Sequence, residues 1–201
     1  MTLISEITEQ PQSIKKLLSS QRKNVEQIAA EIQKRDIQYV FLAARGTSDN
    51  AGRYANYLLG AMNGIPLALA TPSLFTYYKQ PPKLKNALVI GISQSGKSPD
   101  IVSVLEEGKR QGCLTISITN ELNSPLANAS DFVLDVHAGP EKAVAATKTY
   151  TGELMSVAML SAALTGNKKA WVELARVSAW MEQTLKQSDF IADTCQRYRY
   201  I

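Results

Sequence analysis

Residues 86–100, Asn-Ala-Leu-Val-Ile-Gly-Ile-Ser-Gln-Ser-Gly-Lys-Ser-Pro-Asp, decide the fold of this chain. The apolar, β-branched run that opens the stretch is typical of a buried strand, and the Ser-Pro-Asp that closes it is typical of a helix start. Between them lies a loop rich in glycine and serine. Free N–H groups and the positive end of the helix dipole face such a loop, so the stretch predicts an anion site at a strand-to-helix turn.

Residues 91–98 also satisfy the P-loop pattern G-x-x-x-x-G-K-[ST], which holds nucleotide phosphates. Pro99 argues against a nucleotide, because proline removes an N–H that a P-loop would offer to a phosphate. The acid best placed to hold magnesium is Asp135, at the end of an apolar run, and this is a weak signal. A P-loop NTPase therefore stays a remote alternative. A second alternative is a turn rich in serine and glycine that binds no ligand.

Strands and helices alternate along the chain, and this order predicts a parallel sheet covered on both faces, a three-layer αβα sandwich. The expected helices include residues 11–34, 49–62, 98–110, 147–164 and 168–187. The five expected strands are residues 37–43, 65–70, 86–90, 113–118 and 131–136.

Ligands of such sheets bind at the carboxyl ends of the strands. That rule selects four turns, residues 45–48, 71–73, 93–98 and 119–120. The first and third carry glycine with hydroxyl groups just ahead of a helix. Two polar turns at one edge make a phosphate pocket more credible than either turn does alone.

Composition excludes several classes of protein. The 201 residues are 45% hydrophobic and 20% charged with a net charge of +4, which is ordinary for a globular protein. We expect no nucleic-acid partner, because the chain has no basic run. Without a signal peptide or a long apolar stretch, we expect a cytoplasmic protein with no membrane partner. We expect no metal and no cofactor; Cys113 and Cys195 give no disulfide framework, and His137 is expected to bond to backbone at a strand end.

Three motifs resemble the sugar isomerase (SIS) domain in order and spacing: Arg-Gly-Thr-Ser at 45–48, Ser-Gln-Ser-Gly-Lys-Ser at 93–98, and residues 138–148. The chain is most similar to the first of two such domains in the isomerase part of glucosamine-6-phosphate synthase and in its isomerase-only relatives. The resemblance covers nearly the whole chain. It implies a flavodoxin-like α/β fold that binds the phosphate of a hexose 6-phosphate or amino-hexose 6-phosphate.

The resemblance also implies site residues. Phosphate-binding residues would be Thr47, Ser48, Ser93, Gln94, Ser95 and Ser98. Sugar-binding residues would be Gly46, Val144 and Ala145. Ala146 stands where the synthase has serine, which puts one sugar hydrogen bond in doubt. Lys97 replaces an acidic residue common in this loop. Glu141 and Lys148 are the local candidates for a catalytic carboxylate and amine.

The resemblance further implies that a second SIS domain, which would carry the general base, the ring-opening histidine and the Schiff-base lysine, lies outside this chain. We expect residues 1–35 to form an N-terminal helical segment, 36–165 the SIS domain, and 166–201 a helix and linker towards that missing half. Tyr-Arg-Tyr-Ile at 198–201 resembles the approach to its first strand.

We expect the longer protein to be a homodimeric aldose-ketose isomerase, aminosugar-phosphate deaminase or deglycase, and this chain alone to be inactive. The alternative is a noncatalytic phosphosugar sensor.

Overall fold

The computed structural model describes residues 2–198 and has a five-stranded, all-parallel sheet at its centre. The strands run in the order β2-β1-β3-β4-β5. This confirms the predicted α/β sandwich and is the flavodoxin-like order. The strands are β1 (Tyr39–Ala43), β2 (Leu67–Leu69), β3 (Ala87–Ile92), β4 (Leu114–Thr119) and β5 (Phe132–Asp135).

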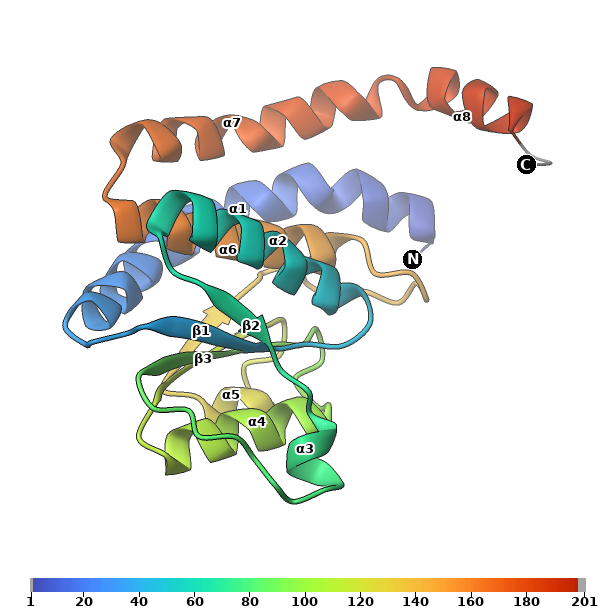
Figure 1. Cartoon of the computed structure of the whole chain (residues 1–201). Helices are drawn as coiled ribbons and strands as arrows, with labels where there is room; N and C mark the ends of the chain where they lie inside the picture. The colour runs from blue at the N-terminus through green and yellow to red at the C-terminus, as the bar shows by residue number, and fades with distance from the viewer. Residues whose placement is uncertain (1, 199–201) are drawn as a thin grey trace.

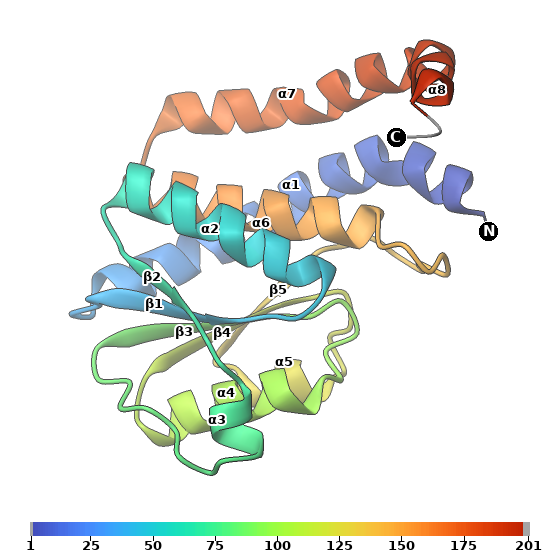
Figure 2. The ribbon, with the colours of Figure 1, turned by 45° about the vertical axis from the view of Figure 1, so that its right-hand side comes forward.

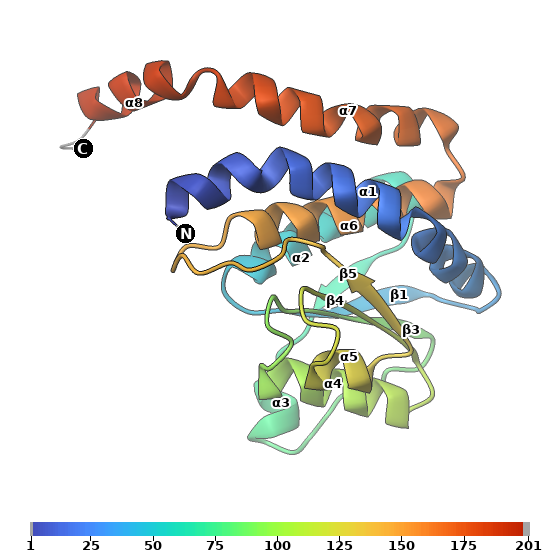
Figure 3. The ribbon, with the colours of Figure 1, turned by 180° about the vertical axis from the view of Figure 1, so that it is seen from behind.

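Helices cover both faces of the sheet (Figures 1 and 2). One face carries α3 (Ser73–Thr76), α4 (Pro99–Arg110) and α5 (Pro125–Ala129). The other face carries α1 (Leu3–Gln33), α2 (Thr47–Asn63) and α6 (Lys148–Thr165). Beyond α1 and α6, α7 (Lys168–Leu185) forms an outer layer that continues into α8 (Ser188–Arg197), as Figure 3 shows from behind.

The alternation of side chains along each strand divides the core in two. Leu42 and Ile90 point towards α1, α2 and α6, where they join one buried cluster with residues such as Met155. Phe41 and Val89 point the other way and pack with Val104 and neighbours on α4 and α5. A sheet buried on both faces explains why its central strands read as continuous apolar runs.

The first helix begins earlier than residue 11, the start expected from the sequence. A capping box between Thr2 and Ser5 starts the helix, and Pro11 lies inside it. Proline cannot donate to the carbonyl of Ile7, but the side chain of Gln10 does so at 3.1 Å. The predicted boundary was wrong because a local side chain replaces the missing backbone donor.

The carboxyl-terminal part also differs from expectation. The last predicted helix ends at Leu185 rather than at residue 187, and α8 was not predicted. Residues 199–201, most of the segment expected to approach a second domain, lie outside the described residues. Within residues 2–198, no helix combines the length and apolar character that crossing a membrane requires.

We predict that Leu42→Ala lowers the free energy of unfolding by about 2–5 kcal/mol, because Leu42 is fully buried and the truncation leaves a cavity. Leu122→Ala is the matched control, since Leu122 is exposed; its effect should stay within about 0.5 kcal/mol. Urea unfolding measures both. Equal losses from the two variants would contradict the placement of the core.

Candidate functional site

The loops after β1 and β3 leave the sheet side by side at its carboxyl edge. Ala43 is paired in register with Gly91, so strands β1 and β3 reach that edge together. From β1 the sheet continues to β2 on one side, and from β3 it continues to β4 on the other. This is the switch point at which open α/β sheets bind ligands. An ion pair of 3.0 Å between Arg45 Nη1 and Asp100 Oδ2 joins the loop after β1 to the first turn of α4.

The loop over residues 93–98 is held in one conformation. Gly96 has φ +60°, and a Cβ there would lie 2.1 Å from Ser124 Oγ, so only glycine fits. The carbonyl of Gln94 accepts the N–H of Asn120 at 3.1 Å, and Ser93 N–H donates to Ile118 O at 3.1 Å. The loop is therefore fixed to β4 and the turn after it.

This loop presents several hydrogen-bond donors. Ser93 and Ser98 lie with their Oγ atoms 3.5 Å apart. Ser98 is the N-cap of α4 as predicted, but its hydroxyl makes no capping bond and is available to a ligand. Within residues 2–198, the N–H groups of Gln94 and Ser95 donate no hydrogen bond. Lys97 is exposed.

The start of α2 supplies the second group of predicted residues. Gly46 is its N-cap, with φ +58° and no side chain to occupy the helix end. Thr47 and Ser48 follow in the first turn, where N–H groups favour an anion. Thr47 is exposed, whereas Ser48 is buried and donates from Oγ to Glu153 Oε1 at 2.8 Å.

The predicted sugar-side residues lie in the loop between β5 and α6. Val144 is fully exposed and Ala145 is exposed beside it. In Figure 2 this gold loop and the start of α6 lie at the same end of the molecule as the start of α2. The structure thus brings the three predicted motifs to one end of the sheet.

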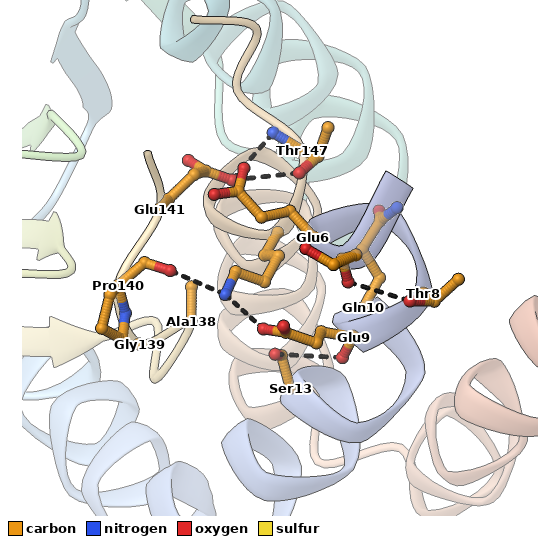
Figure 4. Close-up of polar contacts among 12 residues, drawn as sticks. Glu6, Thr8, Glu9, Gln10, Ser13, Ala138, Gly139, Pro140, Glu141 and Thr147 are labelled. Atoms are coloured by element: carbon orange, nitrogen blue, oxygen red, sulfur yellow. Dashed lines mark hydrogen bonds and ion pairs between the residues drawn. The ribbon is translucent and has the colours of Figure 1, made fainter. Parts of the chain in front are cut away.

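Glu141 lies in this loop and caps α6. Its carboxylate accepts hydrogen bonds from the N–H and the hydroxyl of Thr147 at 2.9 and 3.2 Å (Figure 4). It also accepts a hydrogen bond from the hydroxyl of Thr149. Burial alone would raise the pKa of Glu141, but the hydrogen bonds from Thr149 and Thr147 outweigh burial and lower it. The carboxylate is therefore charged and already engaged.

Lys148 is also engaged. Its side chain is 1% exposed, and its Nζ lies 2.6 Å from Glu9 Oε2 and 2.8 Å from the carbonyl oxygen of Pro140. Figure 4 labels both of these partners. Glu6, fully buried on α1, accepts the N–H of Lys142 at 2.6 Å and that of Ala143 at 3.2 Å. These side chains fasten the loop to α1.

The sequence predicted that His137 bonds to backbone, but its side chain contacts two other side chains instead. Its Nε2 lies 3.0 Å from Gln21 Nε2, and its Nδ1 lies 3.2 Å from Asp135 Oδ2. The residue has φ +52°, and its own N–H donates to Asp135 Oδ1. The expectation was wrong because the tight turn after β5 brings the imidazole ring against α1 and Asp135. The carboxylate of Asp135 is therefore engaged by His137.

Two hollows of about 590 Å³ lie away from these motifs. One is at the amino edge of the sheet, where Arg35, Lys83 and Lys85 are among its lining residues. The other is apolar and lies between α1, α7 and α8. Neither is lined by a residue predicted to bind phosphate or sugar.

Sequence reasoning missed three acids that act at this edge: Glu6, Glu9 and Glu153. Glu6 and Glu9 lie in the N-terminal helical segment ahead of the apolar stripe that begins at residue 11, and no site role was expected for them. Glu153 could have been noticed, since it is an acid within a helix that is apolar nearly all round.

The SIS domain family model matches residues 34–163. Over 98% of its own length, the chain is 33% identical to the glutamine–fructose-6-phosphate aminotransferase [isomerizing] of Aquifex aeolicus. Over 79% of its own length, it is 38% identical to the enzyme of the same name from Caldanaerobacter subterraneus. It spans 33% and 27% of those curated relatives.

Among solved structures, a Silicibacter pomeroyi protein provisionally called a phosphosugar isomerase superposes with a TM-score of 0.85 at 36% identity. That match covers 88% of this chain and 54% of the other. The C-terminal domain of glucosamine-fructose-6-phosphate aminotransferase from Francisella tularensis superposes with a TM-score of 0.78 at 25% identity, covering 95% and 57%.

The all-parallel sheet with polar loops at its switch point is typical of α/β domains that bind ligands at the carboxyl edge of the sheet. Together with the match over residues 34–163, it identifies this chain as a member of the SIS domain family, which confirms the predicted resemblance.

We predict that Glu6→Ala loosens the loop over residues 139–147, because the N–H groups of Lys142 and Ala143 lose their acceptor. Hydrogen exchange of these two amides should accelerate about tenfold or more. Glu26→Ala is the control on the same helix, since Glu26 is exposed and pairs with Arg22. Unchanged exchange at Lys142 and Ala143 would refute the anchoring role of Glu6.

Proposed function

We propose that this chain binds the phosphate of a hexose 6-phosphate or amino-hexose 6-phosphate at the carboxyl edge of its sheet. The observation that carries the proposal is the loop over residues 93–98, in which hydroxyl groups and unbonded N–H groups lie beside the start of α2. Such donors can bind a phosphate through hydrogen bonds and the positive end of a helix dipole. The relatives named above support a sugar phosphate, because their names include fructose 6-phosphate or a phosphosugar.

In this proposal Ser93, Ser95 and the N–H groups of Gln94 and Ser95 hold the phosphate from one loop. Thr47 and Ser48 approach it from α2, and Ser98 contributes the hydroxyl that it does not use for capping. Gly46, Val144 and Ala145 lie on the sugar side. Residues 36–165 would form the phosphosugar-binding domain, with the segments before and after it as flanking helices.

We further propose that the reaction, an isomerisation or deamination of the sugar phosphate, uses groups outside this chain. The local candidates are engaged elsewhere: Glu141 caps α6, and the amine of Lys148 is bonded to Glu9 and Pro140. A proton transfer between neighbouring sugar carbons needs a base within hydrogen-bond reach. A second SIS domain, or a second copy of this chain, would supply it.

The exposure of Val144 supports such a partner. An aliphatic side chain fully open to water at the edge of a binding site gains free energy when another surface covers it. A homodimer or a tandem protein acting in the cytoplasm, where phosphorylated sugars are converted, would fit this arrangement.

We predict that the chain binds fructose 6-phosphate and glucosamine 6-phosphate in titration calorimetry but does not turn them over. Ser93→Ala should weaken binding by about tenfold or more, since a hydrogen bond to a charged phosphate is lost. Ser19→Ala, on the exposed side of α1, is the control and should bind as the wild type does.

ATP with magnesium, titrated in parallel, tests the remote P-loop alternative. Tight magnesium-dependent binding of ATP, or the absence of any sugar-phosphate binding, would overturn the proposed function.

A further inference from the structure

Glu153 is a buried acid directly behind the candidate phosphate site. It lies on α6, it is 1% exposed, and its Oε1 is 2.8 Å from Ser48 Oγ. Its Oε2 is buried, and within residues 2–198 it has no hydrogen-bond partner. An ionised carboxylate with an unpaired buried oxygen is costly, so the environment favours the neutral acid.

Burial is the main cause that raises the pKa of Glu153, to about 8. The hydrogen bond from Ser48 works in the opposite direction, and the negative charge of Glu141 raises the pKa further. At pH 7 Glu153 therefore carries a proton, which is unusual for a glutamate.

Helices α1, α2 and α7, which pack against α6, carry charged groups that have partners of their own. On α1, Glu9 pairs with Lys148, and Glu6 accepts loop N–H groups. On α2, Asp49 pairs with Arg53 at 3.2 Å. On α7, Glu173 pairs with Arg176 at 3.4 Å. Glu141 is the acid whose charge acts on Glu153.

We propose that Glu153 is a positioning residue: its neutral form donates a hydrogen bond to Ser48 Oγ and so directs the Ser48 proton to the phosphate of the ligand. The inference rests on the proposed function and adds to it a proton-dependent element in the site. Glu153 acts through Ser48 and does not touch the sugar phosphate itself.

The reason lies in the single proton of a serine hydroxyl. When Glu153 is ionised, it can only accept, so Ser48 donates to it and turns a lone pair towards the ligand. A phosphate dianion needs donors, so that arrangement repels it. When Glu153 is protonated, its O–H can donate to Ser48 Oγ, and the hydroxyl of Ser48 becomes free to donate to a phosphate oxygen. Ionisation also places a negative charge one hydroxyl away from the phosphate.

The test measures the Kd for fructose 6-phosphate by calorimetry between pH 7 and pH 9.5, where the phosphate stays a dianion. If only the protonated form binds, the wild-type Kd rises about thirtyfold over this range. Glu153→Gln keeps the shape and can donate to Ser48, but it has no proton to lose, so its Kd should not change with pH. Glu106→Gln, an exposed carboxyl on α4, is the control and should keep the wild-type pH dependence.

A second readout needs no sugar. Between the ordinary pKa of about 4.5 in the unfolded chain and about 8 in the folded chain, the folded state holds a proton that the unfolded state has released. Stability of the wild type should therefore fall relative to Glu153→Gln as pH rises from 5 to 8 in urea unfolding.

The outcomes separate the two proposals. Binding with the same pH dependence in the wild type and in Glu153→Gln overturns the role of Glu153 and leaves the proposed function standing. Absence of binding by both at every pH overturns the proposed function and the positioning role with it, while the unfolding series still reports whether Glu153 holds its proton. Loss of the pH dependence in Glu153→Gln alone supports the inference.

Discussion

The in-register parallel pairing of β1 with β3 is the constraint on which the rest of the site depends. It brings two loops from distant parts of the sequence to one edge, at the point where the strand order reverses. The loop after β3 then keeps its shape because Gly96 leaves room for Ser124. Donors fixed in this way need no rearrangement when an anion arrives, which is why such edges recur as binding sites.

A second constraint comes from buried charge. Glu6, Glu9 and Lys148 join α1 to the loop before α6 across most of the length of the chain. Each of these contacts gives a buried polar group the partner that its loss of water requires. The long amino-terminal helix therefore does more than cover the sheet: it fixes the loop that holds Glu141 and exposes Val144. Figure 4 shows Glu6 and Glu9 on α1 facing Glu141 and Pro140 of this loop.

Much of this could be predicted from the sequence. The alternation of apolar runs with helical segments predicted the sheet, and the glycine and hydroxyl residues at 45–48 and 93–98 predicted which edge would be polar. The start of α1 could not be predicted from Pro11, because the side chain of Gln10 replaces the lost donor. The roles of Glu6 and Lys148 depend on contacts between residues far apart in sequence, and neither periodicity nor local motifs report such contacts.

The central claim is that the carboxyl edge holds the phosphate of a sugar. A crystal structure of the protein grown with glucosamine 6-phosphate tests it most directly. We predict phosphate oxygens within hydrogen-bond distance of Ser93 Oγ, Ser95 Oγ and the N–H groups of Gln94 and Ser95. A phosphate found instead in the hollow near Arg35, Lys83 and Lys85, at the opposite edge of the sheet, would contradict the account.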